Sequence, residues 1–133
     1  MRARLTAFSI ITFALLAAGV FAAELAAQRS SAAGVTVAVA PQNLTPGAKS
    51  WDFKIVLDTH SQDLSDDLVK IAALLDDRGS RHLPVKWEGA GPGGHHRSGT
   101  LKFNAISPQP KSIELQIQRS GESGPRSFRW QLK

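Results

Sequence analysis

Apolar and polar residues alternate along most of the chain after residue 34, and this period of two predicts β-strands. Val35, Val37 and Val39, for example, are separated by Thr36 and Ala38. The segments that follow or approximate this pattern are 35–40, 51–58, 71–75, 81–87, 101–103, 113–118 and 128–132. Pro, Gly, Asn and Asp cluster between the segments, and these residues favour turns. The pattern therefore predicts seven short strands joined by turns.

Seven short antiparallel strands in roughly 100 residues are typical of an immunoglobulin-like β-sandwich. The sequence therefore predicts an all-β fold of that type, with the apolar faces of two sheets enclosing the core. The aromatic residues of the strands fall on faces that should point inward: Trp51, Phe53, Trp87, Phe103, Phe128 and Trp130. In 81–87 the same face carries Leu83 and Val85, and Pro84 on the other face suggests an edge strand.

The segment 64–75 leaves two alternatives open. Ser65 could cap a single helical turn that precedes a strand over 71–75, or the whole segment could be one amphipathic helix, since Leu64 and Leu68 are four residues apart. We favour the turn and strand, because the segment 81–87 follows at hairpin distance.

The N-terminus has the layout of an export signal. Arg2 and Arg4 precede the stretch 5–23, in which fifteen of nineteen residues are apolar and none is charged. Small residues then allow cleavage before Ala23, with a later candidate site after Ala27. The alternative is an uncleaved helical anchor, since nineteen uncharged residues are nearly enough to span a membrane. Either alternative places the rest of the chain outside the cytoplasm, in the periplasm or the extracellular space.

This pattern divides the 133 residues into three parts. Residues 1–22 are expected to be a signal peptide or membrane anchor, 23–34 a flexible tether, and 35–133 the sandwich domain. The tether is expected because the segment is rich in Ala, Ser and Gln.

Several function classes are excluded by composition. There is no Cys, so disulfides, thiolate metal sites and a cysteine nucleophile are absent. The glycine-rich run 89–94 lacks the Gly-Lys-Ser/Thr that completes a phosphate-binding loop, and no nucleophile elbow is present. We therefore expect a binding or accessory protein rather than an enzyme, and we expect no tightly bound cofactor.

The four histidines provide one candidate site. In an antiparallel sandwich, the loops after alternate strands share one end, so 58–70 and 88–99 should be adjacent. This would gather His60, His95 and His96, with Asp58 and Glu88 as weaker candidates, while His82 belongs to the opposite end. Imidazoles and carboxylates bind Cu and Zn, so the set suggests a metal site. The alternatives are solvated histidines on flexible loops and a surface that responds to pH.

Charge is unevenly distributed along the chain. Residues 51–77 carry seven Asp and two Lys, whereas 97–133 carry seven Lys or Arg and two Glu. Arg119, Arg126, Arg129 and Lys133 would lie close together if the last two strands pair, forming a basic face for an anionic surface. The expected partners are an envelope protein or such a surface, not nucleic acid, and a membrane only through 5–23 if that stretch is uncleaved.

A family resemblance agrees with these expectations. Leu57-Asp58-Thr59-His60-Ser61, Trp87-Glu88-Gly89 and Gly93-Gly94-His95-His96-Arg97 resemble segments of a group of small exported bacterial proteins of unknown function. The resemblance implies a similar immunoglobulin-like sandwich and covers most of the chain after residue 23. It implies no activity, substrate or ligand.

Overall fold

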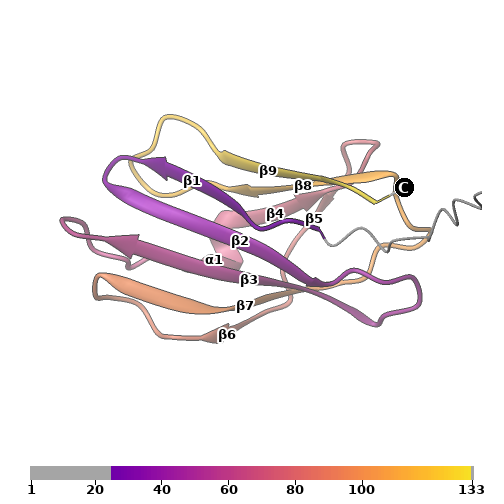
Figure 1. Cartoon of the computed structure of the whole chain (residues 1–133), viewed down its shortest axis with the longest axis horizontal. Helices are drawn as coiled ribbons and strands as arrows, with labels where there is room; N and C mark the ends of the chain where they lie inside the picture. The colour runs from indigo at the N-terminus through magenta and orange to yellow at the C-terminus, as the bar shows by residue number, and fades with distance from the viewer. Residues whose placement is uncertain (1–24, 133) are drawn as a thin grey trace, which may run out of the picture.

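Nine strands form two antiparallel sheets in the computed structural model, which describes residues 25–132 (Figure 1). The five-stranded sheet has the order β1 (Gln28–Ala32), β2 (Val35–Asn43), β3 (Ser50–Thr59), β7 (His96–Asn104) and β6 (Lys86–Gly89). The four-stranded sheet has the order β5 (Arg81–His82), β4 (Ala72–Leu75), β8 (Ser112–Ile117) and β9 (Arg126–Gln131). The all-β, antiparallel, two-sheet prediction is therefore confirmed.

The expected signal or anchor in residues 1–22 lies outside the described residues. Within residues 25–132, no helix is both long enough and apolar enough to cross a membrane.

The expectation of a flexible tether over 23–34 is wrong for the described part of that range. Gln28–Ala32 forms β1 and pairs with β2 from Gln28↔Val39 to Ala32↔Val35. Ala33 and Gly34 both have positive φ, at 49° and 76°, as a tight turn between twisted antiparallel strands requires. The strand was missed because it lies at the sheet edge and shows no alternation of apolar residues.

Polar contacts instead hold β1 in place against the last strand. The side-chain amide of Gln28 donates to the carbonyl of Arg129 at 2.5 Å and accepts from its N–H at 3.1 Å. The indole N–H of Trp130 donates to the carbonyl of Ala26 at 2.8 Å. Hydrogen bonds from Ala26 and Gln28 to β9 therefore join the two sheets along one side of the molecule.

The predicted strand 81–87 is two strands, because the chain changes sheets within it. β5 belongs to the four-stranded sheet and β6 to the five-stranded sheet. Between them Pro84 is buried, whereas Leu83 and Val85 are 67% and 55% exposed. The expected inward face of Leu83 and Val85 is therefore wrong. A crossing segment has no regular pleat, so alternation cannot assign its faces.

The segment 64–75 contains a single helical turn followed by a strand, as favoured from the sequence. The turn is α1 (Leu68–Ile71), and β4 begins at the next residue. Asp67 caps it rather than Ser65, since the Asp67 carboxylate accepts from the N–H of Val69 at 3.1 Å.

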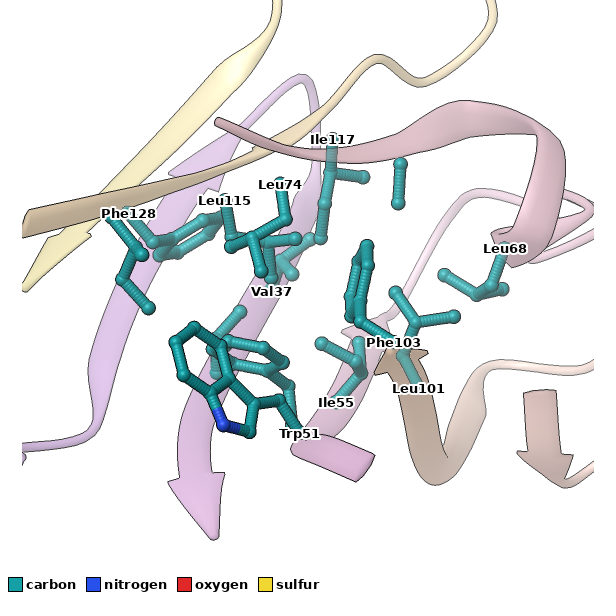
Figure 2. Close-up of a cluster of buried hydrophobic side chains, with 14 of the residues drawn as sticks. Val37, Trp51, Ile55, Leu68, Leu74, Leu101, Phe103, Leu115, Ile117 and Phe128 are labelled. Carbon is teal, nitrogen blue, oxygen red and sulfur yellow. The ribbon is translucent and has the colours of Figure 1, made fainter. Parts of the chain in front are cut away.

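The core lies between the two sheets, and Figure 2 shows part of it. Phe53 is at its centre, with its ring 5.6 Å from that of Phe103 and 5.7 Å from that of Trp130. All three strand phenylalanines, together with Trp51 and Trp130, are buried as expected. Trp87 is only partly buried, because it lies on β6 at the edge of the sheet.

Candidate functional site

The histidine loops lie at one end of the molecule, as the sequence predicted. β3 ends where β7 begins, and Asp58 pairs with His96 across the two strands. The N–H of Thr59 donates to the carbonyl of His95 at 2.9 Å, and the N–H of Gly93 donates to the carbonyl of Leu64 at 2.9 Å. The adjacency of the loops 58–70 and 88–99 is therefore confirmed.

Only one pair among the candidate ligands makes direct contact. The Asp58 carboxylate binds Nδ1 of His96 on the outer face of the five-stranded sheet. His60 and His95 are exposed at the same end without a hydrogen-bonded side-chain partner among the described residues. Within residues 25–132, no group of three or more His, Asp or Glu side chains is placed to hold a metal ion.

Glu88 does not join the histidines. It pairs with Lys86 at 3.3 Å and Lys102 at 3.8 Å, farther along the same outer face. His82 stands apart, as expected, and contacts Asp76. The structure therefore gathers Asp58 and His96, brings His60 and His95 to the same end, and separates Glu88 and His82 from them.

The Asp58–His96 contact determines what His96 offers to solvent. A carboxylate that accepts a hydrogen bond from Nδ1 of a neutral imidazole leaves the lone pair on Nε2, the ring nitrogen that does not contact Asp58. The His96 side chain is 66% exposed. In this structure Asp58 therefore fixes the orientation of the His96 ring.

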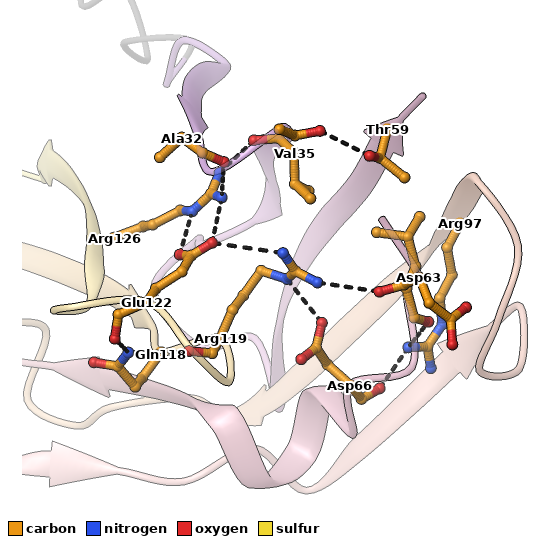
Figure 3. A network of polar contacts seen from close by, with 12 residues as sticks. Ala32, Val35, Thr59, Asp63, Asp66, Arg97, Gln118, Arg119, Glu122 and Arg126 are labelled. Atoms are coloured by element: carbon orange, nitrogen blue, oxygen red, sulfur yellow. Dashed lines mark hydrogen bonds and ion pairs between the residues drawn. The ribbon is translucent and has the colours of Figure 1, made fainter. Parts of the chain in front are cut away.

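The expected basic face does not form, because two of its four members are buried. Arg119 pairs with Asp66 at 2.8 Å, and Arg126 pairs with Glu122 at 2.7 Å, as Figure 3 shows. In these two ion pairs, each arginine and each carboxylate has a side-chain exposure of 8% or less. Arg129 is exposed but paired with Glu114, and Lys133 lies outside the described residues.

These buried charges join three separate segments at the end of the molecule that carries the histidines. Arg126 also donates to the carbonyls of Ser30, Ala32 and Val35, at 2.8–2.9 Å. Glu122 has a lowered pKa, chiefly because Arg126 hydrogen bonds to its carboxylate, although burial acts in the opposite direction. Two of the four basic residues that the sequence suggested for binding, Arg119 and Arg126, therefore join segments of the fold instead.

Arg97 is a third buried arginine at this end, with 2% of its surface exposed. It donates to the carbonyls of Ala90 and Leu64, at 3.0 Å and 3.3 Å, and to that of Asp66. Its guanidinium carbon lies 5.5 Å from the centre of the Trp87 ring, within range of a cation–π contact.

The close approach of β6 and β7 beside Trp87 gives a prediction. A Cβ at Gly99 would lie 2.7 Å from the carbonyl oxygen of Glu88, from Cα of Gly89 and from the Trp87 ring. Gly99→Ala should therefore lower the free energy of unfolding by about 1–3 kcal/mol in urea titrations. Gly91→Ala is the matched control, since nothing lies within 4 Å of its Cβ position. Equal effects of the two changes would contradict this account.

A groove at the opposite end was not predicted. Its volume is about 720 Å³, and it lies between the β4–β5 turn and the β7–β8 connection. The lining residues are Asp76, Asp77, Arg78, Ser80, His82, Ile106, Ser107, Pro108, Gln109, Pro110 and Lys111. Both segments contain turn residues in the sequence, but the contact between them depends on how the chain crosses from one sheet to the other.

Two aspartates shape this groove. Asp76 accepts from the N–H groups of Arg78 and Ser80 and contacts Nε2 of His82 at 3.1 Å. Asp77 accepts from the N–H of Lys111 at 2.9 Å and so links the two segments. The two carboxylates therefore stabilise the turn and the link between the two segments that form the groove.

The contact with His82 predicts how Asp76 titrates. The His82 hydrogen bond lowers the pKa of Asp76 below its ordinary value of 3.8, and the N–H groups of Arg78 and Ser80 act in the same direction against burial. His82→Ala should raise this pKa toward 3.8, which carboxyl NMR titration would measure. Exposed His60→Ala is the control and should leave it unchanged. An unaltered Asp76 pKa in His82→Ala would mean that the turn N–H groups alone cause the shift.

Comparison with known proteins shows similarity of fold alone. No family model matches the chain, and no curated protein matches it in sequence. A DUF4426 family protein from Pseudomonas aeruginosa, whose crystal structure is known, superimposes with a TM-score of 0.50 and 12% identity. The match covers 79% of this chain and 93% of that chain. The chain is therefore similar in fold to a small bacterial protein of a family of unknown function.

Proposed function

We propose that this protein is an exported, non-enzymatic binding domain of the bacterial cell envelope, built on an immunoglobulin-like sandwich. The groove between the β4–β5 turn and the β7–β8 connection is its binding site. The observation that carries the proposal is the groove itself, whose two walls are joined by the Asp77–Lys111 contact. Its volume of about 720 Å³ lies in the range of small-molecule sites.

The placement of the charged residues supports binding rather than catalysis. The buried arginines Arg97, Arg119 and Arg126 bind backbone carbonyls or carboxylates that join loops. Asp76 and His82 close a turn. The apolar stretch 5–23 supports a place in the envelope.

Cu or Zn binding through His60, His95 and His96 is a second candidate function. The Asp58–His96 contact favours it, because a carboxylate on one ring nitrogen orients the other toward a metal. His60 and His95 would have to change rotamer to join His96. This candidate places the site at the opposite end of the molecule from the groove.

One NMR experiment tests both candidates, because the two sites lie far apart in the fold. Isotope-labelled protein, purified as the producing cell processes it, is titrated with Zn(II), with lipid vesicles and with soluble peptidoglycan fragments. The proposed function predicts shifts of backbone amides in 76–82 and 105–111 with an envelope component. Zinc-dependent shifts confined to 58–60 and 94–97 would favour the metal site instead.

Cell fractionation supplies the second readout. The protein should be recovered outside the cytoplasm, with an N-terminus at or near Ala23. Recovery of full-length chain in the cytoplasm, or groove amides unmoved by every envelope component, would overturn the proposal.

A further inference from the structure

β6 ends the five-stranded sheet, and no other strand in residues 25–132 pairs with its second side (Figure 1). The remaining sheet edges differ from it. β1 and β9 are end strands of the two sheets, and Gln28 on β1 binds the backbone of Arg129 on β9. β5, at the other end of the four-stranded sheet, has only two residues. β6 is therefore the longer open edge in the described part of the molecule.

The hydrogen-bond pattern shows which backbone groups of β6 face outward. The N–H of Ala90 donates to the carbonyl of Ser98 at 3.0 Å, so these residues form a hydrogen-bonded pair that continues the β6–β7 register. Such pairs alternate with non-hydrogen-bonded pairs along antiparallel strands. Trp87 lies opposite Leu101 in a pair of the second kind. Its N–H and carbonyl therefore point away from β7, toward the position of a further strand.

Exposed apolar side chains gather beside this edge. Leu83 and Val85 are 67% and 55% exposed, and they are the large apolar side chains that stay exposed within residues 25–132. Both lie in the short segment that leads into β6. Trp87, on β6 itself, is only partly buried. A strand added at this edge would remove part of this apolar surface from water, which favours association.

The charges of β6 indicate which strand fits. Lys86 and Glu88 flank Trp87, and their side chains are 65% and 47% exposed. In an antiparallel pair of two β6 strands with a twofold axis at Trp87, Lys86 of each copy lies opposite Glu88 of the other. A pair centred on Lys86 or on Glu88 would instead place like charges opposite each other, which is unfavourable. β6 is therefore complementary in charge to a second β6 when the pair is centred on Trp87.

We propose that two copies of this chain associate through their β6 edges, antiparallel and about a twofold axis at Trp87, so that their five-stranded sheets become continuous. The Trp87 N–H of each copy donates to the Trp87 carbonyl of the other. The segment 83–85 of one copy lies beside 89–91 of the other, where two glycines and an alanine leave room for larger apolar side chains. Both copies use the same surface, so the assembly closes as a dimer. This association does not depend on what the groove binds.

Sedimentation equilibrium tests the proposal on the protein purified as the producing cell processes it, over about 10 μM to about 1 mM. We expect a reversible monomer–dimer equilibrium. Glu88→Lys should weaken dimerisation by about tenfold or more, because Lys86 of each copy then faces a lysine. Lys54→Glu is the control, since Lys54 is exposed on the outer face of β3; it should change dimerisation by less than about twofold. Thermal unfolding of each variant checks that the fold is retained.

Charge reversal distinguishes this interface from other modes of association. Glu88→Lys leaves two lysines on each β6, and Lys86→Glu leaves two glutamates. Each variant alone should be largely monomeric, whereas an equimolar mixture of the two should form heterodimers.

Cross-linking tests the register, because the chain has no cysteine of its own. Positions 86 and 88 of different copies are opposite each other in the proposed pair, at a spacing that a disulfide can bridge. A mixture of Lys86→Cys and Glu88→Cys should therefore form disulfide-linked heterodimers faster than either variant forms homodimers.

A protein that stays monomeric up to about 1 mM would overturn the proposal. So would a dimer that Glu88→Lys and Lys86→Glu leave unchanged, or a mixture of these two variants that associates no more than each alone. Faster cross-linking of Lys86→Cys with itself than with Glu88→Cys would contradict the register centred on Trp87. Addition of a strand from a different protein to β6, in a chain that does not pair with itself, would also overturn the assignment to a second copy.

Discussion

Replacing Arg126 by methionine should lower the free energy of unfolding by about 3–5 kcal/mol. The Arg126 guanidinium pairs with Glu122 and satisfies the carbonyls of Ser30, Ala32 and Val35. Methionine fills part of the space but donates nothing, so buried acceptors lose their partners. Urea unfolding followed by tryptophan fluorescence measures the loss.

Arg129→Met is the matched control for that change. The Arg129 side chain is 77% exposed and pairs with Glu114, and exposed pairs contribute at most about 1 kcal/mol. A loss for Arg126→Met no larger than that for Arg129→Met would show that the buried charges do not hold the end of the sandwich together.

The same variant should also change the response to acid. Glu122 has a pKa below its ordinary value of 4.5, chiefly through Arg126. A carboxyl with a lowered pKa contributes stability above the unfolded-state pKa, and this contribution is lost as pH falls through the folded-state value. Comparing unfolding at about pH 6 and about pH 3 should therefore show a smaller acid-induced loss in Arg126→Met than in the parent protein.

Phe53→Ala should cost about 3–5 kcal/mol, enough to leave so small a domain largely unfolded. Phe53 is fully buried and lies between the rings of Phe103 and Trp130, so its removal leaves a cavity and ends both aromatic contacts. If the variant does not fold, Phe53→Leu supplies a smaller, measurable loss.

Val56→Ala is the internal comparison, since Val56 lies on the same strand but points to the outer face and is only half-buried. It should cost less than about 1 kcal/mol. Similar losses at positions 53 and 56 would mean that the inward face of β3 is assigned wrongly.

Alternation predicted the strands that have one face in the core. β3 is the clearest case, because Trp51, Phe53, Ile55 and Leu57 are all buried and their neighbours are not. Alternation failed where burial does not follow a period of two. β1 is an edge strand that is held by hydrogen bonds to β2 and to Arg129 of β9, not by burial of apolar side chains. The segment around Pro84 passes from one sheet to the other.

The candidate sites, too, could be predicted only where they depend on the order of the strands. The order of the strands alone brought the loops of His60 and His95 to one end, because each antiparallel strand reverses the chain. It could not show that Arg119 and Arg126 are buried, since charge counts carry no information on depth. Nor could it show the groove, which requires the β4–β5 turn to lie beside the β7–β8 connection.

The hydrogen bonds between Gln28 and Arg129 also constrain the order in which the parts of the fold can form. These residues are 101 positions apart, so the side of the sandwich that they close stays open until nearly the whole chain is present. Contacts between such distant positions form late and slow the folding of β-proteins. A chain that emerges from its N-terminus, from a ribosome or through a membrane pore, therefore passes through with β1 lacking its partner on β9. The last strand completes the domain, and unfinished chains retain an open edge on which chaperones or proteases can act.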